Sequence, residues 1–355
     1  MKHPYVDALP HQRWRSAMAR PAPGDIDPMV TSPWRISAQD RVATAGSCFA
    51  QHVARRLRQA GLNLLETEPA HSILSEEIAE AFGYGMFSAR YGSIYTTRQL
   101  LQLMRRAYGR FKPEEDVWIR EDGRLFDPFR PTIQPDGFSN IDEYNLARDV
   151  HFAAVREMFE SVDVFIFTMG LTEAWRSSRD GAVYPLCPGV AAGKFDPERH
   201  EFVNFGVVDI VKDLEEFLQE LHAINLEARV ILTVSPVPLA ATAESRHVWT
   251  STTASKAILR VAAEQVSGSG SIVYFPSYEV ITNPAARGAY FEEDLRTISE
   301  IGIDHVMCLF FKHMVDKNIF KVLGVSPPAN DFLVKAARAM DVLCDEARLD
   351  GDFSV

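Results

Sequence analysis

Cysteine is scarce in this chain, which has 4 among its 355 residues. Cys48, Cys187, Cys308 and Cys344 are widely spaced, and no two of them form a Cys-x-x-Cys pair. This spacing excludes a disulfide scaffold and a structural zinc site of the paired-cysteine type. We therefore expect free thiols, no metal site and no cofactor.

The chain also lacks the segments that carry a protein to or across a membrane. Its first 25 residues hold no apolar run behind a basic patch, and no stretch of about 18 apolar residues occurs anywhere. Positive charge is in deficit as well, since 37 Lys and Arg stand against 48 Asp and Glu, for a net charge of -11 at pH 7. Nucleic-acid binders usually present a basic stripe. We expect a cytoplasmic protein that binds neither membranes nor nucleic acid.

The chain has enough hydrophobic residues to form a core, because its hydrophobic fraction of 46% and charged fraction of 24% are those of an average globular protein. A chain of this length is compatible with two domains or with one large α/β domain that carries insertions. We expect the second arrangement, with three parts. An irregular N-terminal arm covers residues 1–40, an α/β domain covers 41–320, and a helical tail covers 321–355.

Short apolar segments bounded by turn residues alternate with helical patterns along the α/β domain. The predicted strands are 41–45, 62–66, 162–168, 229–234 and 271–275, and the predicted helices include 48–59, 145–160, 209–224 and 253–266. This alternation predicts a flavodoxin-like, three-layer doubly wound parallel sheet with strand order 2-1-3-4-5. Residues 67–144 form a long insertion between strands two and three, with a helix over 98–108. Its aromatic residues either wall a pocket or anchor the insertion to the body of the domain.

Residues directly after the strands are the first candidates for a site, since ligands of open α/β sheets bind at the carboxyl ends of the strands. Ser47 follows the first strand on a turn with Gly46, at the start of a helix. A serine placed there has backbone N–H groups beside its hydroxyl, which a nucleophile and its oxyanion need. Helix capping or close packing is the structural alternative. Cys48 is either a second nucleophile or a small apolar residue that points inward.

The run Gly46-Ser47-Cys48-Phe49-Ala50 resembles the signature of the bacterial GSCFA family, which looks like a branch of the SGNH (GDSL-like) hydrolases. Other stretches resemble the same family in order along the chain; they are 90–96, 168–175, 180–193, 233–238, 255–256 and 275–279. The resemblance extends from about residue 40 to about residue 315. It implies the SGNH fold and a nucleophilic serine.

The resemblance also implies roles for single residues. Ser47 would be the nucleophile, and the N–H groups of Ser47 and Gly92 would hold the oxyanion. Thr172 stands where these hydrolases usually have an asparagine, so a hydroxyl would replace an amide donor. One lost oxyanion donor typically costs on the order of 3 kcal/mol.

The Asp-x-x-His pattern that activates the serine in these hydrolases is absent. Asp294 has Thr297 three residues later in place of histidine. We expect His305 to act as the base, oriented by Asp304, by Asp294 or by a backbone carbonyl. A capping or exposed histidine is the alternative for His305, and His247 and His313 are further candidates for the base.

Glu173, Trp175, Lys256 and His247 are the candidate substrate-binding residues. Residues 180–200, with several charged side chains, are expected to form a polar loop. The resemblance implies a serine esterase, or an O-acyltransferase or deacylase, whose partner is a small-molecule or carbohydrate ester. A catalytically reduced binding or scaffolding protein of the same fold is the competing hypothesis. The sequence leaves the oligomeric state open.

Overall fold

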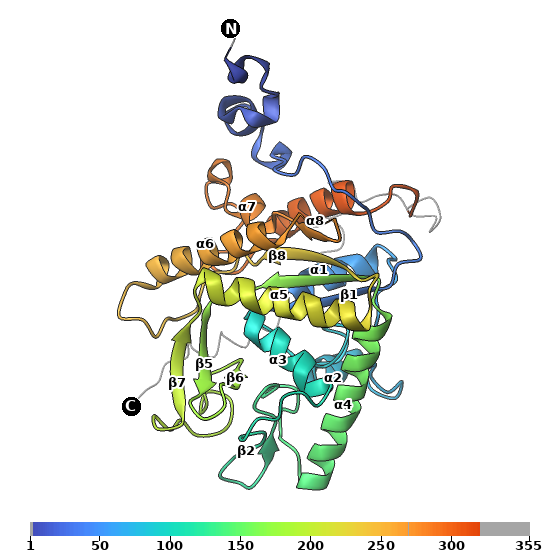
Figure 1. Ribbon diagram of the computed structural model, residues 1–355, viewed down its shortest axis with the longest axis vertical. Coiled ribbons are helices and arrows are strands. Elements are labelled where there is room, and N and C mark those ends of the chain that lie inside the picture. The colour runs from blue at the N-terminus through green and yellow to red at the C-terminus, as the bar shows by residue number, and fades with distance from the viewer. Residues whose placement is uncertain (1–2, 269, 320–355) are drawn as a thin grey trace. The chain divides into compact units, whose positions relative to one another are not determined.

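The computed structural model describes residues 3–268 and 270–319 (Figure 1). The predicted helical tail, 321–355, lies outside the described residues. The described residues form two compact units. We call residues 39–274 the sheet unit, and residues 3–38 with 275–319 the terminal unit.

A parallel sheet of four strands forms the centre of the sheet unit. Its strands are β1 (Val42–Gly46), β4 (Val164–Met169), β8 (Arg229–Val234) and β9 (Ile272–Tyr274), in the order β1-β4-β8-β9. Each lies within about two residues of a strand predicted from the apolar runs, so the α/β class with a parallel sheet is confirmed. Gly46 pairs with Thr168, and Thr168 pairs with Thr233, which brings the carboxyl ends of three strands to one edge.

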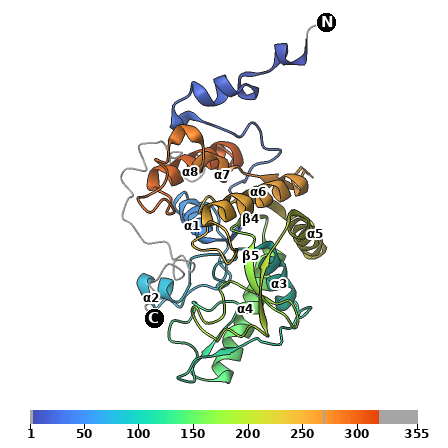
Figure 2. The same ribbon diagram turned by 90° about the vertical axis from the view of Figure 1, so that its left-hand side faces the viewer.

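Helices cover both faces of this sheet, as buried parallel strands require. In Figure 2, β4 lies between helices α1 and α5. The helices are α1 (Cys48–Gln59), α4 (Ile141–Ser161), α5 (Val207–Ile224) and α6 (Val248–Val266). Phe217 of α5 packs against Phe159 of α4 and Phe165 of β4, with ring centroids 5.8 and 5.7 Å apart. These rings join two helices to the sheet in one apolar core.

The prediction of a second strand over 62–66 is wrong. Only Leu64 pairs with β1, through an isolated parallel bridge to Val42. Beyond Glu66 the chain leaves the sheet, because the Thr67 N–H donates to the Ser88 carbonyl 2.8 Å away. The segment therefore lies beside β1 for a few residues and then enters the insertion.

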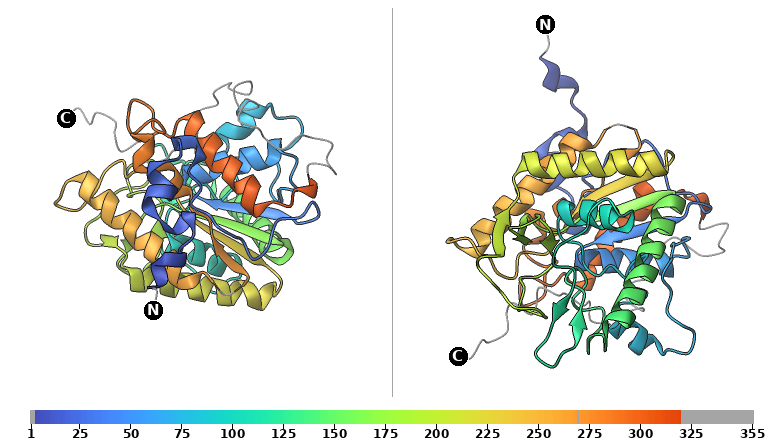
Figure 3. Two further views of the ribbon diagram at one scale, coloured as in Figure 1. Left: turned by 90° about the horizontal axis from the view of Figure 1, so that it is seen from above. Right: turned by 60° about the horizontal axis from the view of Figure 1, so that its bottom comes forward.

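The insertion contains the predicted helix and a short hairpin. Its elements are α2 (Glu76–Ala81), α3 (Thr97–Ala107), β2 (Trp118–Ile119) and β3 (Leu125–Phe126). Helix α3 confirms the helix predicted over 98–108. The hairpin lies beside α4 (Figure 3), and a bridge between Leu125 and Phe138 continues it toward that helix.

Residues 180–200 do not form only a polar loop, and this prediction is corrected. Val183 and Tyr184 form β6 and His200 begins β7, whereas residues 185–199 are a loop as predicted. The strands β5 (Glu173–Ser177), β6 (Val183–Tyr184) and β7 (His200–Asn204) form an antiparallel sheet in the order β6-β5-β7. Trp175 packs edge-on against Phe195 and Phe202, with ring centroids 5.2 and 5.8 Å away. These aromatic contacts stabilise the sheet, although most residues of the loop between β6 and β7 are not apolar enough to predict it.

In the terminal unit, the N-terminal arm packs on a helix from the other end of the chain. Its helical elements are the short turns η1 (Pro4–Asp7), η2 (Pro10–Gln12), η3 (Arg15–Ala19), η4 (Pro23–Asp25) and η5 (Pro284–Ala286), with helices α7 (Ser277–Ile281) and α8 (Glu300–Met314). Asp27 of the arm accepts hydrogen bonds from Lys312 and His313 of α8. Burial raises the pKa of Asp27, but these two partners outweigh it and hold the pKa below its usual value. Within the part of the chain described, no helix is long and apolar enough to cross a bilayer.

Candidate active site

Ser47 lies where β1 ends and α1 begins, at the carboxyl edge of the parallel sheet. The turn depends on Gly46, whose φ is 144°. A Cβ at this position would lie 2.4 Å from the Thr168 carbonyl oxygen of β4. The absence of a side chain at residue 46 lets the two strand ends approach closely enough to hold Ser47 beside β4.

The Ser47 hydroxyl does not cap α1, although its backbone has the extended conformation of an N-cap residue. Its Oγ is buried and has no hydrogen-bond partner among the described residues. Asn140, by contrast, caps α4 by accepting a hydrogen bond from the Glu143 N–H at 2.9 Å. A buried, unpaired hydroxyl costs on the order of 1–3 kcal/mol. Helix capping therefore does not explain the serine.

Gly170, directly after β4, forms one wall of the space around Ser47. A Cβ built on Gly170 would lie 3.1 Å from the Ser47 Cβ and 3.2 Å from the Tyr95 ring. The Tyr95 carbonyl accepts hydrogen bonds from the N–H groups of Gly170 and Leu171, at 2.9 and 3.2 Å. The buried Lys256 ammonium donates to the Gly170 carbonyl. These contacts fix the backbone that faces the serine.

The three groups expected to hold an oxyanion differ in their present bonding. The Ser47 N–H donates to the Thr168 carbonyl at 3.2 Å, and the Thr172 hydroxyl donates to Asn204 Oδ1 at 2.7 Å. The N–H of Gly92 has no hydrogen-bond partner among the described residues. Two residues further on, the Ile94 N–H donates to the Gly46 carbonyl at 2.8 Å, which ties this loop to the turn of Ser47. Gly92 is thus the free donor of the three.

Glu173 and Trp175, together with Leu171, line a groove of about 300 Å³. Its lining is mainly apolar and includes Leu171, Glu173, Trp175, Leu186, Phe202 and Leu239. The Glu173 carboxylate accepts hydrogen bonds from the Thr242 hydroxyl at 2.8 and 2.9 Å. Burial is the largest influence on this carboxyl and raises its pKa. The groove offers one polar anchor in an apolar surround, as small-molecule sites commonly do.

The other two substrate-binding candidates have structural contacts. His247 caps α6, where its Nδ1 accepts a hydrogen bond from the Trp249 N–H at 3.1 Å. Lys256 is 1% exposed and directs its ammonium at the Gly170 carbonyl. The sequence reasoning missed Asn204, which joins Thr172 to Glu244 through a hydrogen bond of 2.9 Å. No periodic signal marks it, because the run His200-Glu201-Phe202-Val203-Asn204 of β7 does not alternate between polar and apolar residues.

The predicted base and its partners lie in the terminal unit. His305 Nδ1 is 2.9 Å from the Tyr290 hydroxyl, and burial lowers the pKa of the imidazole. Asp294 accepts hydrogen bonds from the backbone and hydroxyl of Thr297, at 2.8 and 2.6 Å. Since Ser47 belongs to the sheet unit and His305 to the terminal unit, their pairing stays a prediction.

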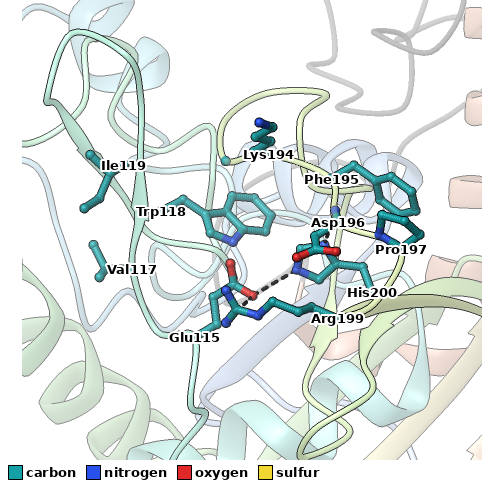
Figure 4. A pocket seen from close by; sticks show the side chains of 11 residues that line it. Glu115, Val117, Trp118, Ile119, Lys194, Phe195, Asp196, Pro197, Arg199 and His200 are labelled. Carbon is teal, nitrogen blue, oxygen red and sulfur yellow. Dashed lines mark hydrogen bonds and ion pairs between the residues drawn. The ribbon is translucent and has the colours of Figure 1, made fainter.

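A second cavity, of about 500 Å³, lies between the insertion and β7 and contains none of the predicted site residues (Figure 4). Glu115 accepts from His200 Nε2 at 2.9 Å, and His200 Nδ1 accepts from the Asp196 N–H at 3.1 Å. Both ring nitrogens of His200 therefore have a hydrogen-bond partner. The pair ties the insertion to β7.

Comparison with known proteins assigns most of the chain to one family. The model of the GSCFA family matches residues 41–310. No curated protein matches the chain.

Two solved structures show a distant likeness at 12% sequence identity each. One is an acetyl esterase mutant with an acetate ion, for which the TM-score is 0.30 over 76% of this chain and 92% of the esterase. The other is a carbohydrate esterase family 3 protein from Talaromyces cellulolyticus, with a TM-score of 0.32 over 81% of this chain and 100% of that protein.

Replacing Ser47 by alanine distinguishes a free hydroxyl from a helix cap. We expect Ser47→Ala to leave the free energy of unfolding unchanged or to raise it by up to about 1 kcal/mol, because an unpaired buried hydroxyl is removed. Asn140→Ala, the matched control at a true cap, should lose about 1 kcal/mol. Urea unfolding followed by circular dichroism measures both. Equal losses in the two variants would show that Ser47 caps α1 after all.

Proposed function

The chain belongs to the GSCFA family, and from this premise we propose that it is a serine esterase or acyltransferase with the three-layer SGNH arrangement. The observation that carries the proposal is the Ser47 hydroxyl, buried and unpaired at the carboxyl edge of a parallel sheet. An unpaired buried hydroxyl does not stabilise the fold, whereas a nucleophile must have its lone pairs free. The proposed substrates are esters or acyl groups of carbohydrates or other polyhydroxyl compounds.

In the proposed reaction, Ser47 Oγ attacks the ester carbonyl and gives its proton to the base, which we assign to His305. The tetrahedral intermediate expels the alcohol, which takes that proton from the base, and an acyl-serine remains. Water in a hydrolase, or an acceptor hydroxyl in a transferase, then attacks the acyl-serine and gives its proton to His305. The bond between the acyl carbon and Ser47 Oγ breaks, and the serine takes that proton back. The Gly92 N–H is the first donor for the oxyanion, since it makes no other hydrogen bond.

The groove lined by Leu171, Glu173 and Trp175 is the proposed place for the substrate. Its apolar walls suit an acyl chain or the face of a sugar ring, and the Glu173 carboxylate suits a hydroxyl group. Because Ser47 is only 3% exposed, an acyl group reaches its hydroxyl only after side chains around it move. Binding of substrate must supply the free energy for that movement.

The hydrogen bonds of Asp294 favour a second candidate function, a binding protein that keeps the fold without turnover. Its carboxylate accepts from Thr297, the residue that stands where the related hydrolases have histidine. Both carboxylate oxygens are engaged within this local turn. In that case the groove beside Glu173 would bind a ligand without cleaving it.

Ser47→Ala should reduce hydrolysis of a short-chain p-nitrophenyl ester by at least about a hundredfold, because the nucleophile is removed. Cys48→Ala is the matched control from the next position. Its thiol is buried, so this variant should keep most of the activity and lose about 1 kcal/mol of stability. Steady-state kinetics of the two purified variants measures the difference. Loss of activity in the Cys48 variant alone would assign the nucleophile to the thiol.

The pH profile of the same reaction tests His305 as the base. Burial lowers the pKa of this imidazole below 6.5, so it stays neutral and able to take a proton at neutral pH. We expect kcat/KM to be flat near pH 7 and to fall with acidification only below pH 6.5, as the imidazole becomes protonated. His305→Gln should remove this acid limb together with most of the activity. An acid limb that persists in His305→Gln would identify a different base.

Thr297→His gives the matched gain-of-function control, because it completes an Asp-x-x-His sequence with Asp294. If His305 is the base, this substitution should leave kcat/KM within a few-fold of the starting protein. A rise of a hundredfold or more from an inactive starting protein would instead support the binding-protein alternative.

A further inference from the structure

The insertion and helix α4 together hold a cluster of charged and titratable side chains that are almost completely buried. Its members are Glu68, Arg90, Arg106, Asp127, Arg130 and His151, each less than 10% exposed. All belong to the sheet unit and lie outside the proposed catalytic groove. Burying an ionised side chain is costly unless an opposite charge compensates it, so the balance of charge in this cluster matters.

Positive charge exceeds negative charge in the cluster. Asp127 pairs with Arg130 at 2.8 Å, and Glu68 contacts His151 Nδ1 at 2.7 Å. Burial is the largest influence on His151 and lowers its pKa to about 4, so the imidazole is neutral at pH 7. Three guanidinium groups therefore face two carboxylates, which leaves one positive charge without a counterpart.

Arg106 carries the uncompensated charge. Its guanidinium lies over the Phe129 ring, 3.6 Å from the centroid, and donates no hydrogen bond within the described residues. Its nearest carboxylate, that of Asp127, is 3.9 Å away and already bonded to Arg130. Burial lowers the pKa of Arg106 to about 10, which still leaves it charged at neutral pH.

Arg130 adds a second unused donor. Its Nε donates to Asp127, and its Nη1 donates to the Arg90 carbonyl at 3.3 Å. Its Nη2 is buried without a hydrogen-bond partner in the described part of the chain. A guanidinium is a donor at every nitrogen and cannot accept, so only an acceptor group satisfies it.

Arg106 and Arg130 both line a small cavity of about 20 Å³, together with Ser93, Gln99, Gln102 and Phe129 among others. This volume admits one or two water-sized groups. The amide oxygens of both glutamines are used elsewhere, by Tyr95 and Thr96 for Gln99 and by Val183 for Gln102. Ser93 is 4% exposed, and its hydroxyl makes no hydrogen bond with the described residues, so it offers a further donor.

We propose that this cavity binds a small anion, a halide or a carboxylate group, held by the guanidinium groups of Arg106 and Arg130 and by the Ser93 hydroxyl. Such an anion adds the negative charge that the cluster lacks. It also accepts a hydrogen bond from Arg130 Nη2, which has no other acceptor among the described residues. Arginine is the side chain best suited to this task, because its planar donors match a carboxylate. The inference is independent of the proposed function.

The test compares thermal unfolding of the full chain in sodium gluconate with that in sodium chloride or sodium formate at equal ionic strength. Gluconate is too large for the cavity and serves as the non-binding anion. We expect chloride and formate to raise Tm saturably, on the order of 3 °C, because they bind only the folded state. A shift with formate but not with chloride would assign the site to the carboxylate of a larger ligand.

Arg106→Gln should abolish the dependence of Tm on the anion, since it removes the excess charge. Arg105→Gln is the matched control one residue away on α3, where Arg105 pairs with Glu216 and Glu220 on α5. It should lower Tm in all buffers and keep the anion-dependent shift. Ser93→Ala, which breaks no ion pair, should raise the half-saturating anion concentration at least threefold and covers the case in which Arg106→Gln fails to fold.

Two results would overturn the proposal. One is an equal Tm of the unsubstituted protein in all three salts, which would mean that water alone fills the cavity. The other is a chloride or formate shift that Arg106→Gln or Ser93→Ala leaves unchanged, which would place the effect elsewhere on the protein.

Discussion

The parallel pairing of β1 with β4 is the contact on which the candidate site depends. It sets Gly46 beside Thr168, and the close approach is possible because residue 46 has no side chain. The chain then turns into α1 with Ser47 at the corner and Gly170 facing it. Any larger residue at position 46 would meet backbone atoms of β4, so the geometry of the serine and the geometry of the sheet cannot change independently.

Polar contacts around this corner serve to fix backbone atoms. Lys256 reaches the Gly170 carbonyl, Ser255 accepts from the Thr172 N–H at 3.0 Å, and Tyr95 accepts from two consecutive N–H groups. Together they hold the backbone next to Ser47 in place, yet they leave the Ser47 hydroxyl without a partner among the described residues, as is also the case for the Thr168 hydroxyl. A fixed backbone around a hydroxyl with free lone pairs is what pre-organisation of a nucleophile requires.

Periodicity predicted the elements that build the parallel sheet, since buried strands and amphipathic helices each have a strong pattern. Helix α1 was predicted from Phe49, Val53 and Leu57 with the bounds that the structure has. The segment 62–66 has similar apolar character, but its pairing ends at Leu64 because Thr67 bonds to a distant residue. Local pattern does not contain that long-range contact.

The antiparallel sheet and the charged cluster could not be predicted from the sequence, because both also depend on contacts between distant residues. Strand β6 has two residues, and the stabilising partners of Trp175 are 20 and 27 residues away along the chain. Arg106 and Arg130 look like ordinary surface charges until folding buries them together. Among the site residues, Ser47 was found from its position after a strand, whereas the free state of its hydroxyl became visible only in the structure.

Covalent labelling measures most directly whether Ser47 is a reactive nucleophile. The protein is incubated with a fluorophosphonate, and its intact mass is determined before the modified peptide is sequenced. We expect one adduct per chain on the peptide that contains Ser47, and none after prior heat denaturation. A native protein that gains no adduct, or carries it on a residue other than Ser47, would show that Ser47 is not the nucleophile.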